Sequence, residues 1–108
     1  MLKILANKYF ELFSNKNIKA IAEMFSEEIA LHDWEINVIG KSNVLQVTKN
    51  IFDSVKSIQV KPINVYCENN TIIAELKIIV NKVEELFVVD IIEFDINNKI
   101  VDITRSEE

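Results

Sequence analysis

The chain has 108 residues, of which 49% are hydrophobic and 27% are charged, which is enough apolar material for one buried core and too little for two. Its 12 Lys and Arg are outnumbered by 17 Asp and Glu. The resulting net charge of −5 argues against nucleic-acid or anionic-membrane partners, because these favour a basic patch. We therefore expect one domain over residues 1–108, with an apolar or neutral small molecule as any ligand.

The cysteine count and the length of the apolar runs indicate the cellular compartment. Cys67 is the only cysteine, which excludes an intrachain disulfide and a cysteine-based metal cluster. The apolar stretch at the N-terminus is interrupted by Asn7 and Lys8, and no apolar run approaches the length of a membrane span. We expect a cytoplasmic protein without a membrane segment, a metal or a cofactor.

Two amphipathic helices are predicted at the start of the chain. Apolar residues recur at steps of three and four over Leu2–Phe13, and the same spacing returns over Ile18–Phe25. The polar run at 14–17 is rich in residues that cap helices, so the pair is expected to form a helical hairpin. β-branched residues then predict a strand at Ile29–Trp34, and the segment ends at the only glycine, Gly40.

A third helix is predicted before a series of strands. Apolar residues at helical spacing follow Ser42, a plausible N-cap, and continue to Val55. Alternation changes phase near Pro62, as at a bulge, and Asn-containing pairs predict tight turns between the later runs. This order of elements predicts an α+β domain in which an antiparallel meander packs its helices on one face. The four predicted strands are Ile58–Cys67, Thr71–Val80, Val83–Asp95 and Ile100–Arg105.

Asp90 is the most informative candidate for chemistry. With one His and one Cys in the chain, catalysis would have to use carboxylates and hydroxyls. Period-two alternation puts Asp90 on the same strand face as Leu86, Val88, Ile92 and Phe94. Desolvation on such a face favours the neutral acid, which can donate a hydrogen bond. Alternatively, the side chain satisfies a nearby backbone group or lies at a sheet edge.

Asp33 and Tyr9 are the next candidates. Asp33 shares a strand face with Ile29 and Leu31, although acids near strand ends are common and a solvated loop carboxylate is the interpretation that its position alone favours. Tyr9 lies on the apolar stripe of the first helix, where it is either a hydrogen-bond donor or a core aromatic residue.

Together these residues carry a resemblance to a known family. The helical hairpin that holds Tyr9 and closes with Phe25–Asp33 resembles the opening of ketosteroid isomerases and their SnoaL-like relatives in the nuclear transport factor 2-like superfamily. The run Val89–Asp95, followed by Lys99 and Ile100 after an Asn turn, resembles the aspartate-bearing strand and next hairpin of that superfamily. The resemblance implies a cone-shaped, curved antiparallel sheet around a pocket, with three helices.

The resemblance also implies roles for the candidates. Tyr9 and Asp90 match the two oxyanion-hole donors of the isomerase, and Asp33 matches its general base. A carboxylate at Asp33 could take a proton from the carbon next to a carbonyl, while the two donors stabilise the enolate oxygen. His32 and the bulky Trp34 flank Asp33 and are candidate ligand-binding residues; alternation points His32 away from Asp33, which leaves a surface or interface role open.

Two classes of function remain open. One is an acid–base enzyme acting on an enolisable carbonyl compound such as a steroid-like or polyketide-like ring. The other is a non-catalytic ligand-binding or dimerisation module of the same fold. A homodimer is expected in either case, because the outward face of the strand Val83–Asp95 carries Phe87, Val89 and Ile91.

Overall fold

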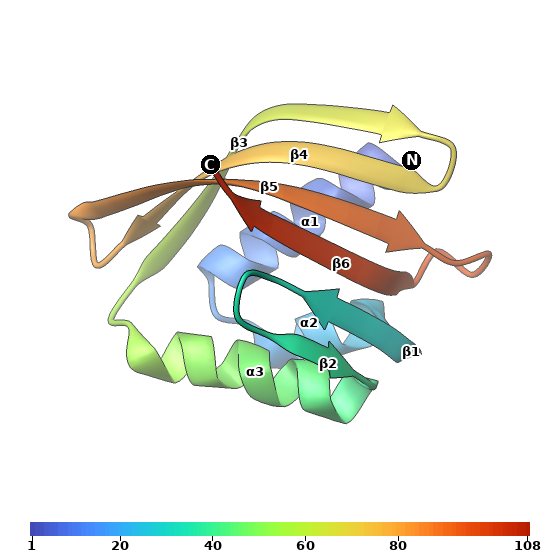
Figure 1. The fold of residues 1–108 in the computed structure, drawn as a ribbon, viewed down its shortest axis with the longest axis horizontal. Coiled ribbons are helices and arrows are strands. Elements are labelled where there is room, and N and C mark those ends of the chain that lie inside the picture. Colours follow the sequence, from blue (N-terminus) through green and yellow to red (C-terminus); the bar gives the residue numbers. More distant parts are fainter.

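A curved six-stranded sheet lies against three helices in the computed structural model, which describes residues 1–108 (Figure 1). The α+β fold expected from the sequence is confirmed. The helices are α1 (Leu2–Ser14), α2 (Ile18–Met24) and α3 (Lys41–Ser54). The strands are β1 (Phe25–His32), β2 (Asn37–Ile39), β3 (Ile58–Glu68), β4 (Thr71–Val80), β5 (Glu84–Phe94) and β6 (Ile100–Glu107).

The strand order departs from a simple meander. The order is β2-β1-β6-β5-β4-β3, so the antiparallel meander predicted for the last four strands is confirmed. However, β1 pairs with β6 in parallel, and β2 adds antiparallel to β1 at the edge. The prediction of a wholly antiparallel sheet was therefore wrong at one pairing, because β1 and β6 come from opposite ends of the sequence and no local turn sets their direction.

The first strand also begins and ends earlier than predicted. It runs over Phe25–His32 rather than Ile29–Trp34, and a short second strand follows at Asn37–Ile39. The predicted end was wrong because Asp33 accepts backbone hydrogen bonds from Glu35 and Ile36 and turns the chain there. This turn places Asp33 and the exposed Trp34 on the lining of the main cavity.

Gly40, not Ser42, is the N-cap of α3. Its φ of +99° is a conformation that glycine adopts without strain. Its amide donates to the Ile29 carbonyl at 2.7 Å, so the start of the helix is attached directly to β1. The helix consequently begins at Lys41, one residue before the predicted cap.

The turn and bulge predictions are confirmed. β3 shifts register against β4 between Pro62 and Asn64. Just before this bulge, the Ser14 hydroxyl accepts a 2.8 Å hydrogen bond from the Val60 amide and donates to the Phe10 carbonyl, which ties α1 to β3. The tight turns of the sheet contain residues with positive φ, namely Asn69, Asn81, Lys82 and Asn98.

The core lies on the concave side of the sheet. α1 packs on β3 and β4, while α3 packs on β1 and β2 at the other side of the cone (Figure 1). A cluster of 21 buried hydrophobic residues joins these layers, and its aromatic members gather around α1. A cavity lined by residues of α1, α3 and the sheet opens into this side.

Candidate functional site

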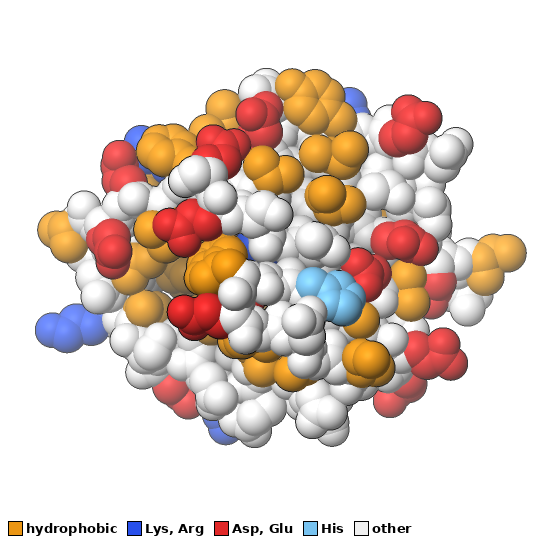
Figure 2. All heavy atoms as spheres, viewed as in Figure 1, with side chains coloured by type: hydrophobic (Ala, Val, Ile, Leu, Met, Phe, Trp, Pro, Cys, Tyr) orange, Lys and Arg blue, Asp and Glu red, His pale blue; other side chains and the backbone are white.

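The main cavity has a volume of about 170 Å³ and opens on the concave side of the sheet. Of its 16 lining residues, 13 are hydrophobic, and these come from α1, the turn after β1, α3 with the residue that follows it, and strands β3 to β5. Figure 2 shows hydrophobic side chains gathered in a hollow that is flanked by acidic groups. The charged lining residues are only three: Asp33, Asp90 and Arg105.

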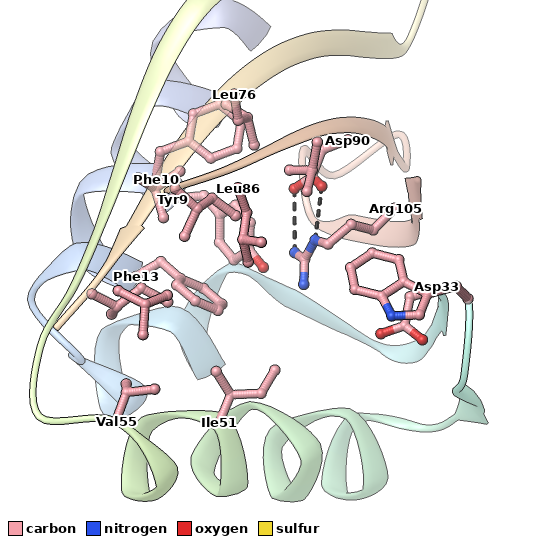
Figure 3. A pocket seen from close by; sticks show the side chains of 16 residues that line it. Tyr9, Phe10, Phe13, Asp33, Ile51, Val55, Leu76, Leu86, Asp90 and Arg105 are labelled. Atoms are coloured by element: carbon pink, nitrogen blue, oxygen red, sulfur yellow. Dashed lines mark hydrogen bonds and ion pairs between the residues drawn. The ribbon is translucent and has the colours of Figure 1, made fainter. Parts of the chain in front are cut away.

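Asp90 and Arg105 form a buried ion pair in the cavity wall. They face each other across β5 and β6, with Nε donating to Oδ1 at 2.8 Å and Nη2 donating to Oδ2 at 3.2 Å (Figure 3). The Asp90 side chain is 1% exposed and that of Arg105 is 11% exposed. Such a bidentate pair fixes the plane and direction of the guanidinium.

The environment keeps Arg105 charged. Burial acts to lower the pKa of Arg105, but the Asp90 carboxylate and the Tyr9 hydroxyl act in the opposite direction, and the net effect raises it. The guanidinium also lies over the Phe13 ring, 5.7 Å from its centroid. The cavity therefore contains a permanent positive group held by a carboxylate on one side and an aromatic ring on another.

The burial predicted for Asp90 is confirmed, but its surroundings are different from those expected. Both oxygens accept hydrogen bonds from Arg105, so in this structure the carboxyl is an acceptor and not the donor inferred from its apolar strand face. A guanidinium has five N–H donors, and Asp90 engages two of them. Figure 3 shows another guanidinium nitrogen directed away from Asp90 into the open centre of the cavity.

Tyr9 belongs to both the core and the cavity. The residue is 2% exposed, and its ring packs against Phe10, Phe13 and Phe25 with centroid separations of 5.8, 5.9 and 6.1 Å. Burial raises the pKa of Tyr9 to about 12, against the opposing effect of the Arg105 charge. The phenol therefore keeps its proton at neutral pH and remains a hydrogen-bond donor beside the ion pair.

Asp33 lies on the cavity lining at the turn after β1. Its Oδ1 accepts from the amides of Glu35 and Ile36 at 2.8 and 2.7 Å. Both of these bonds use the same oxygen, which leaves Oδ2 available to act as a base. Asp33 thus shapes the loop and also lies on the cavity lining.

The two candidates beside Asp33 are separated by the structure. Trp34 lines the cavity and is 53% exposed, so it forms part of the opening. His32 does not line the cavity, and its assignment as a ligand-binding residue there is corrected. Alternation along β1 turns it to the other side of the sheet, where Nδ1 contacts Asn37 Oδ1 at 2.6 Å and Nε2 lies 3.2 Å from Asp102 Oδ1.

Arg105 is the candidate site residue that sequence reasoning missed. The signal was present, because it is the only arginine in the chain and alternation from Ile103 places it on the core face of its strand. What the sequence lacked was the pairing that sets Arg105 opposite Asp90. No cluster of three or more His, Cys, Asp or Glu with metal-binding geometry occurs in the chain, and none of its helices has the length and apolar character needed to cross a membrane.

The curved sheet, the three helices and the cavity on the concave side are the features of the nuclear transport factor 2-like fold. Residues 6–103 match the SnoaL-like domain, and the chain belongs to that family. A comparison of the sequence with curated proteins finds no match.

Solved structures confirm the fold. The chain is similar to SalBIII, an epoxide hydrolase/cyclase-like enzyme of pyran ring formation in the polyether salinomycin, with a TM-score of 0.87 and 14% identity over 99% of this chain and 90% of that one. A candidate ketosteroid isomerase from Kribbella flavida gives a TM-score of 0.86 and 14% identity over 99% and 77% of the two chains. A candidate polyketide cyclase from Sinorhizobium meliloti gives a TM-score of 0.83 and 13% identity, over 93% of this chain and 91% of that one. At these identities the likeness concerns the fold alone.

Proposed function

We propose that the protein binds a small carbonyl compound in this cavity and catalyses proton transfer at the carbon next to the carbonyl. The observation that carries the proposal is the meeting of two donors, Tyr9 and Arg105, with the carboxylate of Asp33 on the lining of one largely apolar cavity. The names of the neighbouring structures, which include a candidate isomerase and a candidate cyclase, agree with acid–base chemistry of this kind.

The roles follow from the geometry of the polar groups. The substrate carbonyl accepts hydrogen bonds from the Tyr9 hydroxyl and from a guanidinium N–H of Arg105. Asp33 Oδ2 takes a proton from the adjacent carbon, the C–H electron pair forms the C=C bond of the enolate, and the negative charge moves to the oxygen held by the donors. Return of the proton to the same or a conjugated carbon completes exchange or isomerisation.

Asp90 has a different role from the one inferred from the sequence. Because Arg105 pairs with both of its oxygens, Asp90 is a positioning residue that directs the guanidinium toward the substrate oxygen. In this arrangement, the second oxyanion donor is Arg105.

A non-catalytic binding module is the second candidate. One observation favours it: Asp33 Oδ1 is already engaged by two backbone amides, which is a sufficient structural reason for a carboxylate at this position. In that case the cavity binds its ligand through Tyr9 and Arg105 without removing a proton.

Deuterium exchange distinguishes the two candidates. In D₂O, the protein should incorporate deuterium beside the carbonyl of a bound ketone, as measured by NMR or mass spectrometry. Asp33→Asn should reduce this exchange by about 100-fold or more, since it removes the base. The fold should persist because the asparagine oxygen can still accept the bonds from Glu35 and Ile36.

Asp102→Asn is the matched control, because Asp102 lies outside the cavity and should leave exchange unchanged. Exchange that survives Asp33→Asn would assign the base to another residue. Binding of ketones without exchange above the solvent rate would support the binding module instead.

A further inference from the structure

The geometry points to a ligand class for this site: a neutral molecule of about one ring, with a single acceptor oxygen at one edge and an otherwise apolar body. This inference rests on the proposed function for the placement of the oxygen, whereas its size and charge limits come from the cavity itself. Among the steroid-like or polyketide-like compounds expected from the sequence, the inference favours those with about one ring.

The volume sets the size. A dry apolar cavity of about 150 Å³ holds one benzene molecule, so a cavity of about 170 Å³ accommodates about six to nine non-hydrogen atoms inside its opening. Larger rings would have to project through the opening beside Trp34 or displace core side chains. A close-packed interior resists such displacement.

The distribution of polar groups sets the position of the oxygen. Figure 3 shows Asp90, Arg105 and Asp33 on one side of the cavity, with Phe13 and Val55 on the other. The apolar side offers neither donors nor acceptors from its side chains, so a second polar group on the ligand would be buried there without a partner. One edge of the ligand should therefore be polar and the opposite edge hydrocarbon.

The charged residues on the lining favour a ligand without net charge. Arg105 is already neutralised by Asp90, and Asp33 adds a second carboxylate to the lining. With one positive and two negative side chains, the lining has a net charge of −1 when both acids are ionised. An anionic ligand would have to lose its hydration, face two carboxylates and compete with Asp90 for the guanidinium. A neutral ketone meets none of these costs.

Acetophenone and benzoate make a matched test, because both have nine non-hydrogen atoms and nearly the same shape. Affinities are measured by titration, followed through Trp34 fluorescence and the NMR shifts of cavity methyl groups. We expect acetophenone to bind at least about tenfold more tightly than benzoate, since the difference is one buried unpaired charge. Equal or tighter binding of benzoate would overturn the neutrality limit.

A size series tests the volume limit. In the order acetophenone, 2-acetylnaphthalene and a four-ring steroid enone, affinity should fall at each step, because each added ring lies outside the cavity. Ile51→Ala enlarges the cavity at its α3 wall, away from the polar groups, and should improve binding of 2-acetylnaphthalene severalfold. Ile4→Ala is the matched control, since Ile4 is an exposed helical isoleucine outside the cavity, and it should change nothing.

The binding order and the exchange reaction fail separately. If acetophenone binds in the expected order and no deuterium is incorporated, the ligand class stands and the catalytic proposal fails. If exchange occurs and the steroid enone or benzoate binds best, catalysis stands and the ligand class is wrong. Failure of acetophenone to bind at millimolar concentration also overturns the ligand class.

Discussion

On opposite sides of the same sheet, residues of β6 make two contacts that differ in burial: the Arg105–Asp90 ion pair and the His32–Asp102 contact. On the concave side, Arg105 pairs with Asp90, and the two side chains are 11% and 1% exposed. On the outer side, His32 lies 3.2 Å from Asp102, and the side chains are 41% and 32% exposed. Residues 102 and 105 are three positions apart on β6. Alternation along this strand therefore places Asp102 on the solvent-exposed face and Arg105 in the buried cavity wall.

Burial changes both how much each partner costs when it is left alone and how well the geometry of the contact is defined. In the cavity, the low dielectric makes an unpaired charge costly, so each partner depends on the other and the geometry is well defined. On the outer face, water screens the charges and solvates either partner alone. We therefore expect function at the concave pair and small effects at the outer pair.

The largest effect should follow loss of the guanidinium. Arg105→Met should lower the free energy of unfolding by about 3–5 kcal/mol, because it leaves Asp90 buried without a partner. Denaturant titration followed by circular dichroism measures this change.

The double variant Asp90→Leu with Arg105→Met should recover much of that stability, since two apolar residues replace the pair, and it should still lose ketone exchange. A double variant as unstable as Arg105→Met alone would show that the pair itself, rather than the orphaned carboxylate, dominates the energetics.

At alkaline pH, the raised pKa of the buried Tyr9 side chain should affect the stability of the fold. Its pKa rises from the ordinary 10.0 to about 12 on folding, so the folded state retains a proton that the unfolded state loses. This contribution to stability is present below pH 10 and is lost as the pH rises from 10 to 12, by roughly 2–3 kcal/mol.

Tyr9→Phe should lack this part of the decline and also the phenolate absorbance with a midpoint near 12. The comparison uses unfolding curves of both proteins at several values between pH 9 and 12. Parallel declines in the two proteins would contradict the assignment.

On the outer face, we propose that a second copy of the chain covers an outer apolar patch formed by Tyr66, Ile73, Phe87 and Ile91. These residues are 36–53% exposed, and Tyr66, Ile73 and Ile91 are direct cross-strand neighbours. Ile91→Glu should weaken self-association at least about tenfold, because it buries a charge in each copy. Light scattering after size exclusion measures the change.

Ile96→Glu serves as the control, because Ile96 is 97% exposed and lies in the turn between β5 and β6. A monomer in the unchanged protein at micromolar concentration would contradict the proposed dimer.

The smallest effect is expected at the outer contact between His32 and Asp102. His32→Ala should lower the free energy of unfolding by no more than about 1 kcal/mol, as for other solvated pairs. Ketone binding and deuterium exchange should be unchanged, because His32 lies outside the cavity. A loss of exchange comparable to that of Asp33→Asn would return His32 to the site.

The sequence predicted local features better than distant pairings. Helical spacing located α1 and α2, and the Asn-containing turns separated the last four strands, because such signals depend on residues close together in the chain. The parallel pairing of β1 with β6 was missed because it joins segments separated by about 70 residues. The short strand β2 was missed because only three residues pair there.

The prediction of the site was limited in the same way, by pairings between distant segments. The face of Asp90 followed from alternation within one strand, and the resemblance to a known family placed Tyr9 and Asp33 near it. The partner of Asp90 required the register between β5 and β6, which alternation alone does not provide. In our proposal the second donor is therefore Arg105, held by Asp90, rather than Asp90 itself.

The central place of β6 has a consequence for how the protein is assembled during synthesis. Its strand comes last of the six along the chain, yet it lies between β1 and β5. Until β6 has left the ribosome, no strand can join β2-β1 to β5-β4-β3, so the edges of β1 and β5 lack their partner. Arg105 arrives on that closing strand, so the joining of the halves and the completion of the polar end of the cavity are a single event.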